Sequence, residues 1–287
     1  MKNWAILFIM VVLFLPEMVH AQERVAPYNE NSVRPIQESE IMYRRRVWRR
    51  MDLREKMNQP FFAFNSEITK IIIDAVNDGR LFPYTSDSLT RRMTKEEFLD
   101  NMKIPAYGAP TLTDEERAMG FTEEAANDDW GGGGWGDEDE EEADSSRDFY
   151  FLPRQITILE IMEDFIFDKR RSRAYWDILA VKMIIPAKEF ETGFQREVAT
   201  FRYKDLDDLF RSMPEEAFWF NNSNQKANLN MADAFTLRMF SANIIKYWNP
   251  QNRALVDIYT KNPREALLAA KWVEQELLEF EHNLWSN

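Results

Sequence analysis

The chain has 287 residues, a formal net charge of −13 and no cysteine. The absence of cysteine excludes disulfides and thiolate chemistry, and a composition of 45% hydrophobic and 14% aromatic residues excludes a wholly disordered chain. The length allows one large domain or two ordinary ones.

Residues 1–21 have the pattern of a secretory signal peptide. Lys2 precedes an apolar run over residues 5–16, and small or neutral residues at Val19 and Ala21 form a cleavage site. The run is too short to span a membrane, and no other window approaches ~18 uninterrupted apolar residues. We therefore expect an exported, soluble chain without direct membrane insertion, located in a bacterial periplasm because it lacks cysteine. Residues 22–39 are predicted to be a flexible N-terminal segment.

The stretch "YRRRVWRRMDLREKMNQPFF", residues 43–62, concentrates positive charge at the start of the first folded part, residues 40–122. Its arginines suit ion pairs with the chain's own carboxylates or a partner-docking surface. Phosphate binding with base stacking on the tryptophan is a third reading, but exported proteins seldom meet nucleic acid. Asp52 as an N-cap and Glu55 at N3 predict a short helix immediately afterwards. The candidate partner interface consists of Arg44, Arg45, Arg46, Trp48, Arg49 and Arg50.

Two helices are predicted in the rest of this part. Ser66 is a favourable N-cap for a helix over residues 67–77, and Gly79 stands at its C′ position. Residues 81–93 are typical of extended chain. Thr94 and Glu97 then form a capping box for a short helix that ends at Met102. The same signature recurs at residues 113–116.

Residues 123–148 form an acidic, glycine-rich segment. It holds twelve acidic residues and one basic residue, so its net charge is −11 and the rest of the chain carries only −2. Four consecutive glycines beside a block of acids cannot bury enough surface to offset the entropy of ordering. We predict a flexible, self-repelling linker between the two folded parts.

The second folded part, residues 149–287, begins with strands and ends with helices. Residues 156–168 and 174–186 flank a polar turn and predict a hairpin, and residues 197–206 suit a third strand. Residues 230–249 have a helical pattern. Asn262 and Pro263 begin a long C-terminal helix whose apolar stripe includes Ala266, Ala270, Val273, Leu277, Phe280 and Leu284, widened by Leu267, Trp272, Leu278 and Trp285. The expected fold class is α+β with more helix than strand, a small antiparallel hairpin or sheet and this long helix.

Catalytic chemistry is hard to assemble from these residues. His282 is the only histidine after the signal peptide, and Glu279-x-x-His282 is a single copy of a spacing that di-iron sites use twice. "GGGGWG" lacks the Lys-Ser/Thr of a phosphate loop. We predict no catalytic, cofactor-binding or metal-binding residues and no enzymatic activity. Two alternatives remain open: a periplasmic glycosidase-like hydrolase that uses two carboxylates, and a polyanion-binding module built on Arg44–Arg50.

Long strings of the chain resemble the GldN/PorN family of the gliding-motility and type IX secretion machinery. The similar regions are residues 43–107 and 149–285, without the acidic linker. They include "VWRRMDLREKMNQPFF", "EDFIFDKRRS", "FRYKDLDDLFRSMPEEAFWFNNSN", "ADAFTLRMFSANIIKYWNP" and "LLEFEHNLW".

The resemblance implies a non-enzymatic structural subunit. Proteins of this kind associate with an outer-membrane lipoprotein (GldK/PorK) in large periplasmic rings. They also contact a periplasmic shaft protein (GldM/PorM), which is anchored in the inner membrane with GldL/PorL. The implied partners are therefore a lipoprotein at the inner face of the outer membrane, the shaft protein and further copies of this chain, with no nucleic acid.

Overall fold

The computed structural model describes residues 28–105, 150–190, 192–260 and 262–285. The predicted signal peptide, the capping signature at residues 113–116 and the acidic linker lie outside these ranges. None of the helices within them is both long and apolar enough to cross a membrane.

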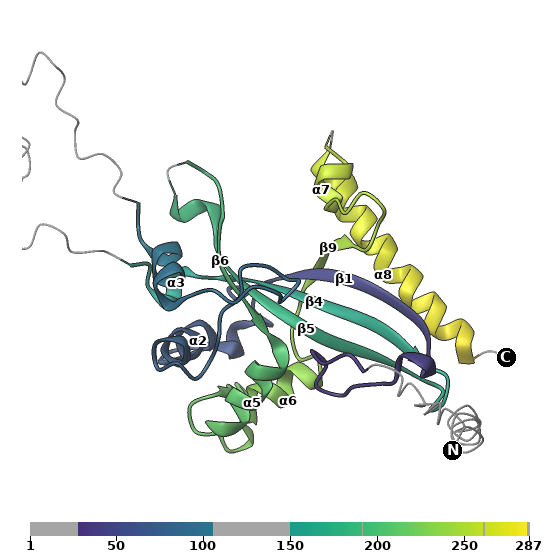
Figure 1. Cartoon of the computed structure of the whole chain (residues 1–287), viewed down its shortest axis with the longest axis horizontal. Helices are drawn as coiled ribbons and strands as arrows, with labels where there is room; N and C mark the ends of the chain where they lie inside the picture. Colours follow the sequence, from purple (N-terminus) through teal and green to yellow (C-terminus); the bar gives the residue numbers. More distant parts are fainter. Residues whose placement is uncertain (1–27, 106–149, 191, 261, 286–287) are drawn as a thin grey trace, which may run out of the picture.

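The centre of the fold is a five-stranded antiparallel sheet with the strand order β6-β5-β4-β1-β9 (Figure 1). The predicted hairpin and third strand are confirmed in this sheet. Strand β1 precedes the acidic linker, and both of its neighbours follow the linker, so the two folded parts share one sheet. The bounds are β1 Ile41–Asp52, β4 Ile158–Asp168, β5 Arg173–Ile185, β6 Arg196–Arg202 and β9 Asn243–Tyr247.

Four short helices, α2, α3, α5 and α6, lie away from α8 and build the larger core with the sheet (Figure 1). Its aromatic residues include Phe61, Phe210 and Phe235, all at most 1% exposed. The helices are α2 Ile68–Asn77, α3 Lys95–Met102, α5 Tyr203–Ser212 and α6 Met231–Thr236. Two small hairpins border this region: β2 Phe62–Ala63 with β3 Ser66–Glu67, and β7 Phe218–Trp219 with β8 Leu229–Asn230.

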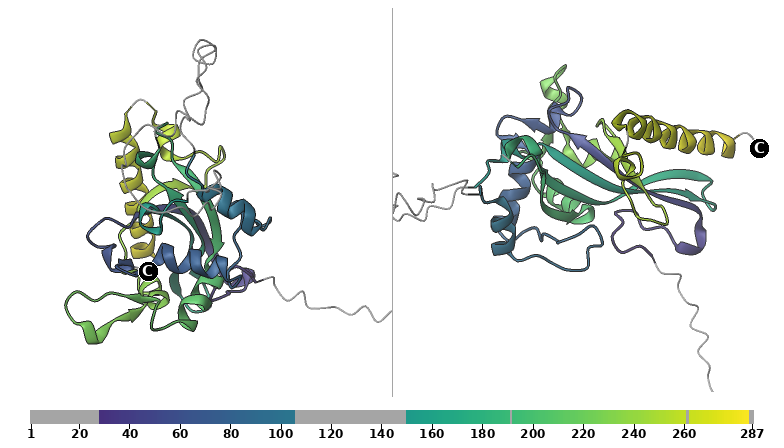
Figure 2. Two further views of the ribbon diagram at one scale, coloured as in Figure 1. Left: turned by 90° about the vertical axis from the view of Figure 1, so that its left-hand side faces the viewer. Right: turned by 90° about the horizontal axis from the view of Figure 1, so that it is seen from above.

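The C-terminal helix α8, Pro263–Trp285, runs alongside the other end of the sheet (Figure 2). The side chain of Asn262 accepts a hydrogen bond from the backbone of Arg264 at 3.0 Å, which confirms the predicted N-cap. Ala266, Ala270, Val273 and Leu277 are buried against Val47 and Phe165, together with α7 Leu255–Ile258. The apolar stripe therefore covers the protein's own sheet, as the sequence predicts.

Three of the side chains predicted to widen this stripe do not join the core. Leu267, Trp272 and Leu278 are 54%, 65% and 60% exposed, and the neighbouring Leu268 is 59% exposed. A helix with a narrow buried stripe can satisfy its own core while leaving further apolar side chains in solvent.

The α+β class is as expected, but the predicted predominance of helix over strand is wrong, because the two are nearly balanced. Helix accounts for 35% of the structure and strand for 30%, and the sheet is larger than the small sheet expected. Two segments explain the difference. Residues 41–52, for which no strand was predicted, form a twelve-residue strand. The short helix predicted from Asp52 and Glu55 is wrong, because turns and a 3₁₀ helix at Gln59–Phe61 follow the strand. Residues 230–249 form only the six-residue α6 before β9.

The local end signals explain where the helices stop and start. After α6, Arg238 adopts a left-handed backbone conformation with φ 54°, which ends the helix. Gly79 does the same after α2 with φ 72°, as predicted. The start of α2 differs from the prediction, because Ser66 lies in β3 and its hydroxyl donates to the backbone carbonyl of Glu216. The capping box at Thr94 and Glu97 is confirmed.

Candidate functional site

The arginine-rich stretch lies on β1, and strand geometry divides its side chains between the two faces of the sheet. Odd-numbered positions face α8, and even-numbered positions face the opposite side. Each arginine has a carboxylate partner in the described part of the chain. The pairs are Arg44–Glu38 at 2.7 Å, Arg45–Glu276 at 2.9 Å, Arg46–Asp164 at 2.7 Å, Arg49–Glu163 at 2.5 Å and Arg50–Glu160 at 3.0 Å.

On the face opposite α8, Arg46 and Trp48 are held by neighbouring side chains. Arg46 forms two hydrogen bonds with the buried Asp164, at 2.7 and 2.9 Å. The indole of Trp48 donates to Asp87 at 2.8 Å, and the amine of Lys246 lies 4.3 Å from the centre of its ring. The edge and one face of Trp48 are therefore already occupied within the chain.

On the face toward α8, Arg49 is the centre of a buried charge network. Its Nε donates to Glu163 at 2.5 Å, and its Nη1 donates to Glu274 of α8 at 3.1 Å. Arg238 donates to the same Glu163 from two nitrogens, at 2.6 and 3.1 Å. Because Glu163 is fully buried, its charge must be compensated within the fold, and two guanidinium groups supply that compensation.

The ring of Trp176 lies against both arginines of this network. The guanidinium carbons of Arg49 and Arg238 are 5.0 and 4.7 Å from its centre, distances that permit cation–π attraction. Phe165 packs against the same indole, with ring centres 4.9 Å apart. The indole thus links the ion pairs to the apolar cluster under α8.

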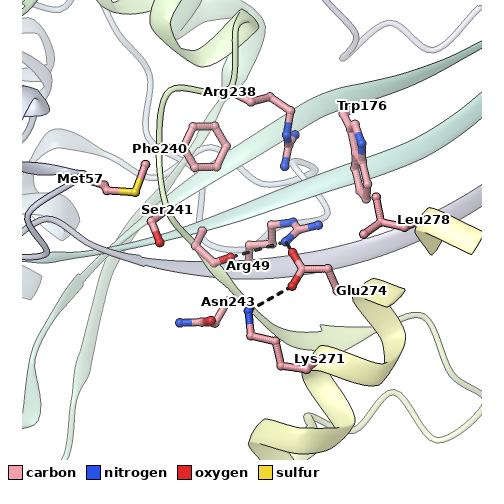
Figure 3. Close-up of a pocket in the computed structure, with 11 residues that line it drawn as sticks. Arg49, Met57, Trp176, Arg238, Phe240, Ser241, Asn243, Lys271, Glu274 and Leu278 are labelled. Atoms are coloured by element: carbon pink, nitrogen blue, oxygen red, sulfur yellow. Dashed lines mark hydrogen bonds and ion pairs between the residues drawn. The ribbon is translucent and has the colours of Figure 1, made fainter. Parts of the chain in front are cut away.

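These groups border an open pocket of about 370 Å³ between β1, α8 and the segment that leads from α6 to β9 (Figure 3). Its apolar lining includes Met57 and Leu278, which are 64% and 60% exposed. Its charged lining comprises Arg49, Arg238, Lys271 and Glu274. Glu163 lies behind the arginines. When it is counted, the three cations Arg49, Arg238 and Lys271 face the two carboxylates Glu163 and Glu274, which leaves one positive charge for an incoming anionic group.

Glu274 remains ionised in this setting. Burial works to raise the pKa of Glu274, but hydrogen bonds from Arg49 and Lys271 outweigh it and lower the pKa below its ordinary value. Both carboxylates of the network, Glu163 and Glu274, are therefore paired with arginine or lysine side chains. No group of three or more His, Cys, Asp or Glu side chains in the described ranges is placed to hold a metal ion. The arrangement suits recognition of an apolar group beside an anionic group.

Sequence reasoning found Arg49 but missed Glu163, Trp176, Arg238 and Glu274. One signal was available for Glu163, because acidic residues interrupt an otherwise apolar strand at residues 158–167. Acids inside a strand buried on both faces need cationic partners, and five arginines are concentrated at residues 44–50. No local pattern marks Arg238 or Glu274, which reach the site only through the tertiary fold.

The structure is that of an α+β protein with one long helix against an antiparallel sheet and a pocket lined by arginine and aromatic side chains. Over residues 36–286 the chain matches the family described as gliding motility associated protein GldN. The chain belongs to this family, which confirms the resemblance seen in the sequence. No curated protein matches the chain.

Proposed function

We propose that this protein is a non-enzymatic structural subunit of the periplasmic ring of the type IX secretion and gliding-motility machinery. The observation that carries the proposal is the match to the gliding-motility family GldN across residues 36–286. In this proposal the partners are a GldK/PorK-like outer-membrane lipoprotein, a GldM/PorM-like shaft protein and further copies of the chain. The protein would then lie in the periplasm at the inner face of the outer membrane.

The surface of α8 supports a function based on protein contacts. Leu267, Leu268, Trp272 and Leu278 are all more than half exposed on one helix. Exposed apolar groups at this density are typical of protein interfaces, and tryptophan is enriched among residues that dominate binding energy. The pocket beside α8 adds aromatic and arginine side chains, the other types favoured at such positions.

The proposal can be tested by purifying the tagged full-length protein from detergent-solubilised outer membranes. We expect a lipoprotein partner to co-purify in ring-shaped particles visible by electron microscopy. Replacing Trp272 and Leu268 by glutamate should reduce the amount of recovered lipoprotein at least tenfold. Both side chains are exposed and contribute little to the monomer's stability, so such a loss can be assigned to the interface and not to unfolding. Gln275→Glu, an exposed change on the same helix, serves as the control. A monomer recovered without any lipoprotein would contradict the proposal.

A further inference from the structure

A second pocket, of about 740 Å³, lies between the two small hairpins β2–β3 and β7–β8. The hairpins are joined by a hydrogen bond from the backbone of Phe220 to the carbonyl of Pro60, at 3.0 Å. Neither the arginines of β1 nor the pocket beside α8 belongs to it.

Aromatic side chains form much of the wall of this second pocket. Four phenylalanines line it: Phe62, Phe64, Phe218 and Phe220. Phe64 is 74% exposed at the tip of the β2–β3 hairpin, followed by Asn65 in a left-handed conformation with φ 63°. The guanidinium carbon of Arg154 lies 4.6 Å from the centre of the Phe64 ring. The Phe64 ring is therefore held beside the pocket by Arg154, although the protein's own core does not cover it.

The charged lining of the second pocket is entirely basic. Arg54, Arg154 and Lys188 line it, and no acidic side chain of the described residues does. The side chains of these three residues are 48%, 52% and 51% exposed. Arg154 also binds Glu67 through its Nε at 2.6 Å, which fixes the guanidinium beside Phe64. Arg54 and Lys188 likewise have carboxylate partners outside the lining, Asp52 at 2.9 Å and Glu189 at 3.2 Å. An anionic ligand would therefore bind these three accessible cations from the pocket side and share them with the chain's own carboxylates.

The pocket also contains a buried polar group without a partner. Thr157 is only 2% exposed, lines the pocket, and its hydroxyl makes no hydrogen bond to any described residue. Buried hydroxyls are nearly always hydrogen-bonded, so an unpaired one requires an explanation. A ligand with a hydrogen-bonding group in the pocket would provide the missing partner.

We propose that this second pocket binds a segment of a protein partner that carries an aromatic side chain between carboxylates. The phenylalanines would receive the aromatic group, the three cations would pair with the carboxylates, and the Thr157 hydroxyl would bond to the segment's backbone. A protein segment is the appropriate occupant if the chain is a ring subunit, so the inference rests on the proposed function and adds the chemistry of one partner contact.

The test measures fluorescence anisotropy of a labelled synthetic peptide, Asp-Asp-Trp-Asp-Asp, titrated with the full-length protein. We expect it to bind at least tenfold more tightly than Asn-Asn-Trp-Asn-Asn, and to weaken as salt rises from about 50 to 500 mM. Arg154→Glu should weaken binding at least tenfold, and Phe64→Ala at least fivefold. Arg91→Glu changes an arginine that is 69% exposed outside the pocket, and should leave binding within twofold.

Thr157→Val separates ligand binding from a purely structural role. Valine keeps the shape of the side chain and removes the unpaired hydroxyl, so the free protein should become more stable, with a higher Tm. The same variant should bind the acidic peptide at least threefold more weakly. A higher Tm with unchanged peptide affinity would exclude the hydroxyl from the site and overturn this part of the proposal.

Two further outcomes would overturn the inference. Equal affinity for the acidic and amide peptides, or full affinity in Arg154→Glu, would show that the cations do not select the ligand. Tighter peptide binding by the double variant Trp130→Ala/Trp135→Ala would assign the pocket to the chain's own acidic segment in place of a partner. The titration contains no lipoprotein, so the two proposals can fail separately. If rings form but the peptide does not bind, only the pocket proposal is rejected. If the peptide binds but no rings are found, only the ring function is rejected.

Discussion

Replacing Glu163 by glutamine removes a fully buried carboxylate that holds two arginines together. Glutamine has nearly the same shape, so the change tests charge and hydrogen bonding with little change in packing. The variant loses the negative charge that accepts three hydrogen bonds, at 2.5 Å from Arg49 and at 2.6 and 3.1 Å from Arg238. Both guanidinium groups then remain in the fold with less compensation.

The magnitude follows from how well each arginine can recover. Removing one partner of a buried ion pair generally costs about 3–5 kcal/mol. The side chain of Arg238 is 29% exposed and can regain water, and Arg49 keeps Glu274, so the lower end of that range applies. We expect the free energy of unfolding to fall by about 3 kcal/mol, which corresponds to a Tm lower by about 6–12 °C.

Urea denaturation followed by tryptophan fluorescence measures this change, and an unchanged m value would show that the unfolded surface is comparable. Glu38→Gln is the matched control, because Glu38 pairs with Arg44 of the same strand and the side chains of Arg44 and Glu38 are 40% and 35% exposed. Such a surface pair is worth about 0.2–1 kcal/mol. If Glu163→Gln costs no more than this control, the network does not stabilise the fold in the way inferred here.

Three further predictions concern stability. Burial raises the pKa of Asp177 to about 6; the nearby charge of Asp164 adds to this shift, and a hydrogen bond with Ser32 opposes it. The folded state therefore holds the Asp177 proton more tightly than the unfolded state does. The free energy of unfolding should accordingly fall as pH rises from about 4 to 6. Asp177→Asn should raise the free energy of unfolding by about 2 kcal/mol at pH 7 and leave it nearly unchanged near pH 3.5. Urea denaturation at a series of pH values measures both, and an effect of the same size at every pH would contradict the predicted pH dependence. At Arg238, glycine accepts the left-handed backbone more readily than alanine, so Arg238→Gly should be more stable than Arg238→Ala by about 1 kcal/mol in urea, and the reverse order would count against strain at this position. Leu277→Ala should cost about 2–4 kcal/mol because Leu277 is 2% exposed, whereas Leu278→Ala should cost less than about 0.5 kcal/mol at 60% exposure; equal losses on thermal melting would argue against the described orientation of α8.

Elements with a strong local signal could be predicted from the sequence. The strands β4 and β5 are mostly apolar runs on either side of a polar turn, and α3 and α8 begin at well-defined caps. Local signals failed where tertiary contacts decide the outcome. Strand β1 is dense in arginine, which is poor evidence for a strand in isolation. It is stable because β4 and β9 pair with it, while β4 and α8 supply most of the carboxylates that its arginines bind.

The same reason limits prediction of the site. Arg49 could be singled out by composition, but its partners lie 114 and 225 residues away in the chain. The second pocket is even less visible, because its phenylalanines and cations come from four separate segments and its diagnostic feature is a hydroxyl without a partner. Such a feature can be recognised only in three dimensions.

The position of β1 has a consequence for the order in which the chain can fold. Strand β1 is synthesised first, yet it pairs with β4, which is more than 100 residues later, and with β9, which follows almost at the end. Pairings this distant are slow to form, so both edges of β1 stay unpaired while most of the chain is produced. Unpaired strand edges promote aggregation. A chain interrupted anywhere before β9 would leave one edge of β1 exposed permanently, so synthesis through Tyr247 is required before both edges of β1 can be paired.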